Sequence, residues 1–203
     1  MIECFFDCSS PWTWLAFHQL RPMAAELGET VDWKPVLVGG IFNAVNPSVY
    51  ESRVRGVPAK QAYLRKDLLD WARHDGLDIR FPPSIFPVNS VKAMRACCWL
   101  KPQGLLESFA DAVFRAYWTD DRDIAQDEVL AGIARAVGVD AVALLAAIAT
   151  PEIKARLKAN TDEAIARGAF GSPTIFVAGD DMYFGNDRLP LVREAVLRRR
   201  LAG

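Results

Sequence analysis

The sequence lacks the features that mark membrane, nucleic-acid-binding and metal-binding proteins. Its longest uninterrupted apolar run, Ala141 to Ala149, is about half the length of a bilayer-spanning helix. The formal net charge is only −1, from 24 Lys and Arg against 25 Asp and Glu, so electrostatics favour neither nucleic acid nor an anionic membrane as a partner. Because the chain has two histidines and four cysteines, and no CxxC motif, we expect no bound metal.

The amino terminus also lacks the cationic segment of a secretory signal, because Glu3 and Asp7 stand where lysine or arginine is expected. The adjacent Cys97 and Cys98 lie in an apolar stretch, which is typical of reduced, buried thiols. We therefore expect a soluble cytoplasmic protein. Its 203 residues, 51% hydrophobic and 24% charged, exclude disorder as the main state and suit one compact unit or one domain with an insertion.

The first forty or so residues alternate between strand and helix signals. Ile2 to Phe6 is β-prone, and the Asp-Cys-Ser-Ser-Pro segment after it favours a turn and then a helix start. Apolar residues at helical spacing continue from Trp12 to Leu27, and Gly28 is a natural stop. Val31 to Val38 predicts a second strand that Gly39-Gly40 ends. This order predicts a right-handed parallel βαβ unit.

The middle of the chain has the periodicity of helices, and no convincing strand interrupts it. Asp140 and Thr150-Pro151 are typical helix caps within this block. The predicted helices span residues 59–76, 88–101, 105–118, 126–137, 141–149 and 151–167.

After Gly168 the strand pattern returns. Thr174 to Val177 and Met182 to Phe184 flank a Gly-Asp-Asp turn that suits a hairpin, and a final helix is expected from Asp187 to about Arg200. The order βαβ, helical block, ββα predicts an α/β protein with a thioredoxin-like fold and an inserted all-helical subdomain. In this interpretation residues 1–58 and 169–203 form the discontinuous thioredoxin-like domain, and residues 59–168 form the insertion.

The first candidate site is the turn that precedes the first predicted helix. Ser10 lies at the amino end of that helix, where unpaired backbone N–H groups and the helix dipole stabilise an anion such as a thiolate. Thioredoxin-like proteins place their attacking cysteine here. An alcohol cannot shuttle disulfides, although Cys8 is close enough in sequence to remain a candidate thiol. Alternatively, Ser9 or Ser10 merely caps the helix and Pro11 takes its first turn.

Two further segments change the balance between these alternatives. Gly171-Ser172-Pro173-Thr174 precedes an apolar strand, where this fold places a cis proline that exposes the N–H and C=O of Ser172 to an extended peptide. Its alternative interpretation is an ordinary strand-initiating proline. The Gly-Asn-Asp-Arg segment at the last helix places Asp187 either as a helix cap or as a carboxylate that recognises an ammonium group.

Six segments together identify a family resemblance. The chain resembles the family of kappa-class glutathione transferases and 2-hydroxychromene-2-carboxylate isomerases, a DsbA-like branch of the thioredoxin superfamily. The resemblance covers nearly the whole chain, and the joint occurrence of its motifs is specific. The segments are FFDCSSPWTWLA, KPVLVGGIFNAVNP, YLRKDLLDWAR, FPVNSVKAMRA, FGSPTIFV and YFGNDRL.

The resemblance implies a glutathione site with Ser10 as the catalytic residue. By the same resemblance Ser172 pairs through its backbone with the cysteinyl part of glutathione, and Asp187 binds the ammonium group. Asn43 stands where many relatives carry a lysine that faces the second substrate, and Ser172 replaces a more usual valine. The implied glutathione-binding residues are Ser10, Pro11, Trp12, Asn46, Lys60, Ser172, Pro173, Phe184, Gly185, Asn186 and Asp187.

The implied activity is glutathione-dependent cis/trans isomerisation of an aromatic enone acid, with glutathione as a cofactor and a small aromatic electrophile as substrate. A kappa-like glutathione transferase is the alternative, and a DsbA-like thiol oxidoreductase or a non-catalytic peptide-binding relative is a third interpretation. Relatives in this family are commonly dimers, which implies a homodimer. Four aromatic residues in helical stretches suit either the core or an electrophile pocket and carry no assignment: Trp71, Trp99, Tyr117 and Trp118.

Overall fold

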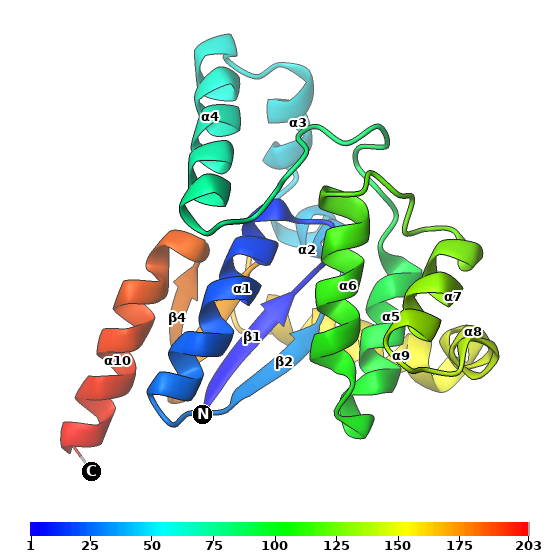
Figure 1. The fold of residues 1–203 in the computed structure, drawn as a ribbon. Coiled ribbons are helices and arrows are strands. Elements are labelled where there is room, and N and C mark those ends of the chain that lie inside the picture. The colour runs from blue at the N-terminus through cyan, green and yellow to red at the C-terminus, as the bar shows by residue number, and fades with distance from the viewer. Residues whose placement is uncertain (203) are drawn as a thin grey trace.

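Four strands form one mixed sheet with helices on both faces (Figure 1). The structure is a computed structural model that describes residues 1–202, except for the side chains of Arg53 and Ala202. The strands are β1 (Ile2–Phe6), β2 (Val31–Pro35), β3 (Thr174–Val177) and β4 (Asp181–Phe184). The helices are α1 (Pro11–Glu26), α2 (Val38–Val45), α3 (Ser48–Val54), α4 (Pro58–His74), α5 (Val91–Leu100), α6 (Leu106–Trp118), α7 (Asp127–Ala136), α8 (Ala141–Ala149), α9 (Pro151–Ala166) and α10 (Leu189–Ala202), with short 3₁₀ helices η1 (Lys101–Gln103) and η2 (Asn186–Arg188).

The strand order in the sheet is β2-β1-β3-β4. β1 runs parallel to β2, with Ile2 opposite Val31, and antiparallel to β3. β3 and β4 form an antiparallel hairpin. The expected α/β, thioredoxin-like fold is therefore confirmed, with the helices from α4 to α9 between the two groups of strands.

Successive side chains of β1 point to opposite faces of the sheet and belong to two different buried clusters. Ile2, Cys4 and Phe6 are buried in the main core with α1, whereas Phe5 belongs to a smaller cluster with residues of α2 and α9. Such alternation follows from the two-residue period of a strand. The α1 face continues into the helical block, because α1 also packs against α4 and α6.

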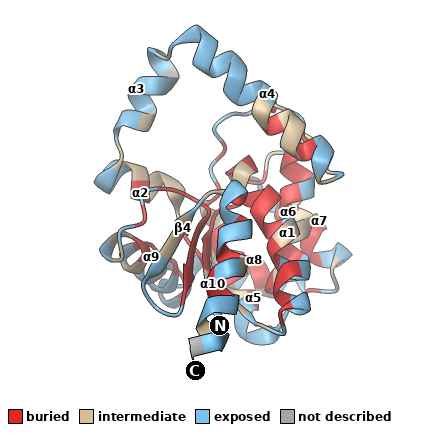
Figure 2. Ribbon diagram, turned by 90° about the vertical axis from the view of Figure 1, so that its left-hand side faces the viewer, coloured by how far each residue is buried: buried red, intermediate tan, exposed pale blue. Residues whose placement is uncertain are grey.

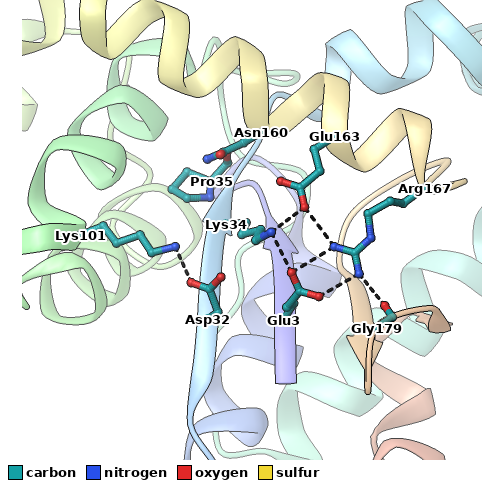
Figure 3. Close-up of polar contacts among 9 residues, drawn as sticks. All are labelled: Glu3, Asp32, Lys34, Pro35, Lys101, Asn160, Glu163, Arg167 and Gly179. Atoms are coloured by element: carbon teal, nitrogen blue, oxygen red, sulfur yellow. Dashed lines mark hydrogen bonds and ion pairs between the residues drawn. The ribbon is translucent and has the colours of Figure 1, made fainter. Parts of the chain in front are cut away.

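A network of charged side chains holds α9 against the second face of the sheet (Figure 3). Lys34 of β2 lies 2.7 Å from Glu3 and 2.6 Å from Glu163 of α9. Arg167 pairs with Glu3 at 2.8 Å, and its guanidinium lies 3.8 Å from the centre of the Phe176 ring. Glu3, Lys34 and Arg167 are largely shielded from solvent. The network therefore joins α9 to the sheet and serves a structural role.

The segment after β2 differs from the prediction. The strand ends at Pro35, and Gly39-Gly40 lies inside α2 instead of ending a strand. Only Gly40 lies where the helix packs closely on α9: a Cβ on this residue would lie 3.3 Å from Cγ2 of Thr161, whereas a Cβ on Gly39 would have open space around it. A second short helix, α3, was also absent from the prediction. Both helices are too short for a clear periodic signal.

Helix α3 and the first turns of α4 stand away from the rest of the molecule and are mostly exposed, as the pale blue ribbon in Figure 2 shows. Val54, Val57 and Leu64 are among the exposed apolar residues of this arm. The amino terminus and the last turn of α10 lie at the opposite end of the molecule (Figure 1). Within residues 1–202, no helix is both long and apolar enough to cross a bilayer.

Candidate active site

Ser10 is the N-cap residue of α1, and its hydroxyl makes two hydrogen bonds. The Oγ accepts the backbone N–H of Thr13 at 3.3 Å and donates to the backbone C=O of Ser172 at 3.1 Å. Pro11 follows at the first helical position, where its missing N–H costs nothing. Ser10 therefore caps the helix, and it also faces the turn before β3. The residue is 9% exposed.

The turn that faces Ser10 contains a cis peptide bond between Ser172 and Pro173, as the sequence predicted. The Ser172 side chain has more contacts than the sequence suggested. Its Oγ accepts the backbone N–H of Asp7 at 3.0 Å and lies 2.8 Å from Oγ1 of Thr13. The hydroxyl thus links the β1–α1 turn, the first turn of α1 and the cis-proline turn.

Asp7 is a buried carboxylate beneath this site, only 1% exposed. It accepts the backbone N–H of Ser9 at 2.9 Å and that of Val38, the first residue of α2, at 2.9 Å. Burial raises the pKa of Asp7, and these hydrogen bonds, together with one from the Ser90 side chain, oppose the rise. Because it joins three segments, Asp7 fixes the backbone from which Ser10 projects.

Cys8, the candidate thiol, lies in the core and not at the site surface. It is fully buried, its N–H donates to Sδ of Met94 at 3.3 Å, and its C=O accepts Nε1–H of Trp118 at 3.0 Å. Burial raises the pKa of the Cys8 thiol, and the neighbouring Cys97 thiol adds to the rise. A thiol in such surroundings is a poor nucleophile.

The acidic turn after β4 lies next to the cis-proline turn. The N–H of Gly185 donates to the C=O of Pro173 at 3.2 Å, and η2, which contains Asp187, packs against α1. Gly185 has a φ of 102°, and a Cβ there would lie 2.7 Å from Oδ1 of Asp187. Asp187 is exposed and pairs with Arg188 at 3.0 Å, whereas Asn186 is buried.

Aromatic rings line the outer side of this turn. The ring of Phe184 lies 4.4 Å, centre to centre, from that of Phe170. Gly171 allows this approach, because a Cβ there would lie 2.7 Å from Cε2 of Phe184. Asn46, at the carboxyl end of α2, donates its amide N–H to the C=O of Phe170 at 3.0 Å. The fold therefore brings Asn46 and Phe184 to the segment that leads into the cis-proline turn.

The remaining predicted residues lie further from this hydrogen-bonded centre. Trp12 is half-buried and packs against the main core. Lys60, in the first turn of α4, and Asn43, on α2, are exposed. Among the described contacts of residues 1–202, neither of these two side chains bonds to Ser10 or Ser172. The predicted glutathione-binding role of Lys60 and the predicted role of Asn43 at the second substrate stay predictions.

The sequence analysis did not predict that Asp7 and Thr13 belong to the site. Asp7 has a sequence signal, because a carboxylate that directly follows a fully apolar strand must find buried hydrogen-bond donors. Thr13 has a weaker one, since a hydroxyl in the first turn of a helix is also compatible with simple solvent exposure. Only the structure brings Thr13 to the Ser172 hydroxyl.

A helix start that faces a cis-proline turn across the end of a four-stranded sheet is the arrangement of thioredoxin-like proteins, and the inserted helices define the DsbA-like class. A model of the DSBA-like thioredoxin domain matches residues 1–197. The chain belongs to this family, in the branch that holds the kappa-class glutathione transferases and the 2-hydroxychromene-2-carboxylate isomerases.

Two curated relatives and one solved structure represent this branch. Human glutathione S-transferase kappa 1 is 31% identical over 94% of this chain and 88% of its own length. A 2-hydroxychromene-2-carboxylate isomerase of Sphingobium xenophagum is 29% identical over 97% of both chains. A solved structure of a 2-hydroxychromene-2-carboxylate isomerase has a TM-score of 0.84 and 27% identity, and it covers 99% of this chain and 97% of that chain.

Proposed function

We propose that this protein is a glutathione-dependent isomerase of the 2-hydroxychromene-2-carboxylate isomerase type, with glutathione as cofactor and an aromatic enone acid as substrate. The observation that carries the proposal is the Ser10 hydroxyl, held at the amino end of α1 and directed at the Ser172 carbonyl across the cis-proline turn. The similarity of nearly the whole chain to such isomerases supports it.

In the proposed binding site, glutathione lies along the backbone of the cis-proline turn. The N–H and C=O of Ser172 pair with the cysteinyl residue as a strand edge would, beside Pro173, and place the sulfur near Ser10, Pro11 and Trp12. The γ-glutamyl group then reaches the acidic turn. There the Asp187 carboxylate pairs with its ammonium group. Phe184, Gly185 and Asn186 form the rest of that turn. Asn46 and Lys60 contact the peptide, and Lys60 pairs with the glycyl carboxylate.

Ser10 acts on the sulfur by a change of hydrogen-bond partner. Its Oγ is held in place as acceptor of the Thr13 N–H, so rotation about the Cβ–Oγ bond redirects the proton without moving the oxygen. The present bond to the Ser172 carbonyl, at 3.1 Å, is long for a hydroxyl donor. The Ser172 carbonyl has two lone pairs, so the cysteinyl N–H of glutathione can donate to it as well. This second bond weakens the one from Ser10, whose proton then turns to the thiolate.

The proposed reaction is a reversible addition. The thiolate adds to the carbon–carbon double bond of the enone, a C–S bond forms, and the electron pair moves to the carbonyl oxygen as an enolate. Rotation about the resulting single bond follows. Collapse of the enolate restores the double bond with trans geometry and expels the thiolate, so glutathione is not consumed. Ser10 and the amino end of α1 stabilise the thiolate at both ends of this cycle.

A glutathione transferase of the kappa type is the second candidate, favoured by the similarity to the human enzyme. It uses the same thiolate but releases the adduct as a stable conjugate. The third interpretation, a thiol oxidoreductase based on Cys8, is disfavoured because this thiol is buried with a raised pKa. A non-catalytic peptide-binding protein would bind glutathione without reacting with any electrophile.

The test combines calorimetric titration with glutathione and turnover of a benzylidenepyruvate-type enone. We expect glutathione to bind, the enone to isomerise without loss of free thiol, and Ser10→Ala to lower the rate about 10- to 100-fold, the loss of thiolate that a rise of about one to two units in the pKa of the glutathione thiol would cause. Stoichiometric thiol loss would assign the transferase instead. Absence of glutathione binding, or an undiminished rate in Ser10→Ala, would overturn the proposal.

We also propose a cytoplasmic homodimer. The exposed apolar residues of the arm, Val54, Val57 and Leu64, are a surface that a second copy would cover. Sedimentation velocity should show a dimer, and Val54→Asp combined with Leu64→Asp should shift it to a monomer. A wild-type protein that sediments as a monomer at micromolar concentration would contradict this part of the proposal and leave the chemistry at Ser10 untouched.

A further inference from the structure

Asp7 carries a buried negative charge that the proposed reaction does not use. Its carboxylate is the only one among the buried side chains of the described part of the chain. The N–H of Ser9 donates to its Oδ1 at 2.9 Å, and the N–H of Val38 donates to its Oδ2 at 2.9 Å. Because a backbone N–H can only donate, both carboxylate oxygens are acceptors, which is the arrangement of an ionised carboxylate.

The amino ends of two helices lie close to this charge. β1 and β2 are parallel, so the helices that follow them, α1 and α2, begin at the same end of the sheet. Val38 is the first residue of α2, and its N–H donates to Asp7. The positive end of α2 is therefore paired with Asp7, whereas the positive end of α1 is left for the glutathione sulfur.

A tight turn separates Asp7 from the proposed position of the sulfur. The N–H of Ser10 donates to the C=O of Asp7 at 3.1 Å. This bond closes a β-turn, which brings the Cα atoms of its first and fourth residues within about 7 Å of each other. Ser172 contacts both residues, because its Oγ accepts the N–H of Asp7 and its C=O accepts the Ser10 hydroxyl. One turn of backbone thus separates the carboxylate from the sulfur.

Little water screens these two charges from each other. Asp7, Cys8, Ser10 and Ser172 are all buried. In a protein interior with an effective dielectric constant of about 20, a unit charge at roughly 8–10 Å changes the pKa of a second group by about 1–1.5 units. Because like charges repel, an ionised Asp7 opposes ionisation of the glutathione thiol.

The other titratable groups around the turn are less suited to this effect. Cys8 and Cys97 meet as buried thiols. Burial raises the pKa of the Cys8 thiol, and Asp111 of α6 adds to the rise, but the Asp111 side chain is 31% exposed and lies 3.7 Å from Arg115. Asp187 is exposed and paired with its neighbour in the chain. Solvent and the arginines therefore weaken the fields of these two carboxylates at the sulfur.

The proposed reaction needs a sulfur that both attacks and leaves. A thiol with a pKa far below the ambient pH is fully ionised, but the nucleophilicity of its thiolate falls with that pKa, so attack is fastest when the pKa lies near the ambient pH. Ser10 and the amino end of α1 both lower the pKa of the bound thiol. A charge that acts in the opposite direction keeps this pKa from falling too far.

We propose that the buried charge of Asp7 opposes ionisation of the glutathione thiol at Ser10 and so preserves the nucleophilicity of the bound sulfur. This inference rests on the proposed glutathione chemistry and adds a residue that adjusts it. Asp7 is a positioning residue and not a catalytic one, because it touches neither the sulfur nor the substrate. Its hydrogen bonds hold Ser10 where it stabilises the thiolate, whereas its charge destabilises the thiolate.

Asp7→Asn tests the charge, because asparagine is neutral and has nearly the same shape. Thiolate absorbance of the glutathione complex, titrated with pH, should give a thiol pKa about one unit lower in Asp7→Asn than in the wild type. At saturating glutathione, the pH profile of kcat/KM for the enone should shift to lower pH by the same amount. Its plateau should fall about threefold, because thiolate nucleophilicity falls by about 0.4–0.5 log units per pKa unit.

The direction of the shift separates the charge from a structural role. If Asp7 only held the turn, its replacement would loosen Ser10 and raise the thiol pKa. Asp7→Thr, whose hydroxyl can still accept one N–H, is a second neutral variant in case Asp7→Asn does not fold, and it should also lower the pKa. Asp7→Glu keeps the charge and should restore the wild-type pKa. The matched control, Asp111→Asn, should shift the pKa less than half as much as Asp7→Asn.

The outcomes distinguish this inference from the function on which it rests. If a folded neutral variant binds glutathione with an unchanged or higher thiol pKa, the inference fails and the glutathione site stands. Loss of glutathione binding in both folded neutral variants would show that Asp7 only holds the turn, and it also overturns the inference. If the wild-type protein does not bind glutathione, the proposed function fails first.

Discussion

At Ser10 a single hydroxyl proton has two competing acceptors in the proposed complex, the Ser172 carbonyl and the glutathione sulfur. In the free protein only the first is present, and the hydroxyl donates to it. The cysteinyl N–H of glutathione competes for the same carbonyl. Binding of the peptide backbone and stabilisation of the thiolate are therefore coupled through one backbone oxygen.

This coupling predicts the behaviour of a glutathione analogue whose cysteinyl N–H is replaced by an ester oxygen. The bound thiol of this analogue should have a pKa about one unit higher than that of bound glutathione, because the Ser10 proton remains on the carbonyl; one unit corresponds to about 1.4 kcal/mol. Thiolate absorbance of the complexes, titrated with pH, measures both values. In Ser10→Ala the difference should vanish. Equal pKa values in the wild-type protein would contradict the exchange.

The Ser172 side chain has a structural role that differs from that of its carbonyl. Ser172→Val leaves the buried N–H of Asp7 without an acceptor, so we expect the free energy of unfolding to fall by about 1–3 kcal/mol. Thr13→Val should cost less, because the Ser172 hydroxyl keeps its bond from Asp7. The double variant should cost less than the sum of the two single variants. Urea titrations of the four proteins give the values, and a fully stable Ser172→Val would refute this account.

The charged network at α9 predicts the response to acid. The Arg167 hydrogen bond, with help from Lys34, lowers the pKa of Glu3 from 4.5 to about 2. A lowered folded-state pKa stabilises the protein above the unfolded value, and this contribution is lost as the pH falls from about 4.5 to about 2. Glu3→Gln should therefore lower the free energy of unfolding by about 1–3 kcal/mol near neutrality and flatten its decline over that range.

The control for this prediction is Glu152→Gln. Glu152 is exposed and pairs with Arg156 one helical turn away, so its removal should change the free energy of unfolding by less than about 0.5 kcal/mol at any pH. Urea titrations at several pH values compare the two variants with the wild type. A Glu3→Gln protein with the acid dependence of the wild type would show that the network has no net effect.

At the scale of elements, α2 depends on what surrounds it more than on its own sequence. Its first turn contains Gly39-Gly40, which disfavours a helix. The Asp7 carboxylate accepts the first N–H of the helix, and the Thr161 hydroxyl accepts the N–H of Leu37 just before it. These two side chains come from other parts of the fold, which is why the local pattern predicted the end of a strand.

The two glycines of α2 should respond differently to alanine. Gly39 has open space around it, so Gly39→Ala should raise the free energy of unfolding by about 0.5–1 kcal/mol through its higher helix propensity. A Cβ on Gly40 would lie 3.3 Å from Cγ2 of Thr161, so Gly40→Ala should gain less or lose stability. Thermal unfolding compares the pair. Equal gains in both variants would show that the contact with α9 does not constrain the helix.

At the scale of the whole molecule, one core joins the sheet and the inserted helices. Residues of β1, α1, α5 and α6 belong to the same buried cluster. The proposed thioredoxin-like domain (residues 1–58 and 169–203) and the proposed insertion (residues 59–168) therefore describe the chain topology, and we do not expect them to fold independently. We expect the tryptophan fluorescence and far-UV circular dichroism transitions in urea to coincide. Two separated transitions would show that the insertion folds on its own.

Most strands and long helices were predictable because their signals are local. The helix from Ala141 to Ala149 was predicted with the bounds that it has in the structure, since an acidic cap and a proline enclose an uninterrupted apolar run. The cis peptide bond before Pro173 was predicted from its place before a strand of this fold, not from the residues alone. Helices α2 and α3 lacked such signals.

By itself the sequence determined the order of the strands and the long helices, the turn that presents Ser10 and the chemical types of the candidate site residues, because these depend on neighbours along the chain. Only the tertiary structure decided that Cys8 is buried, that Asp7 ties three segments together, and that the Ser172 hydroxyl joins Asp7 and Thr13. Such contacts depend on distances between segments far apart in sequence, which packing of the whole core sets.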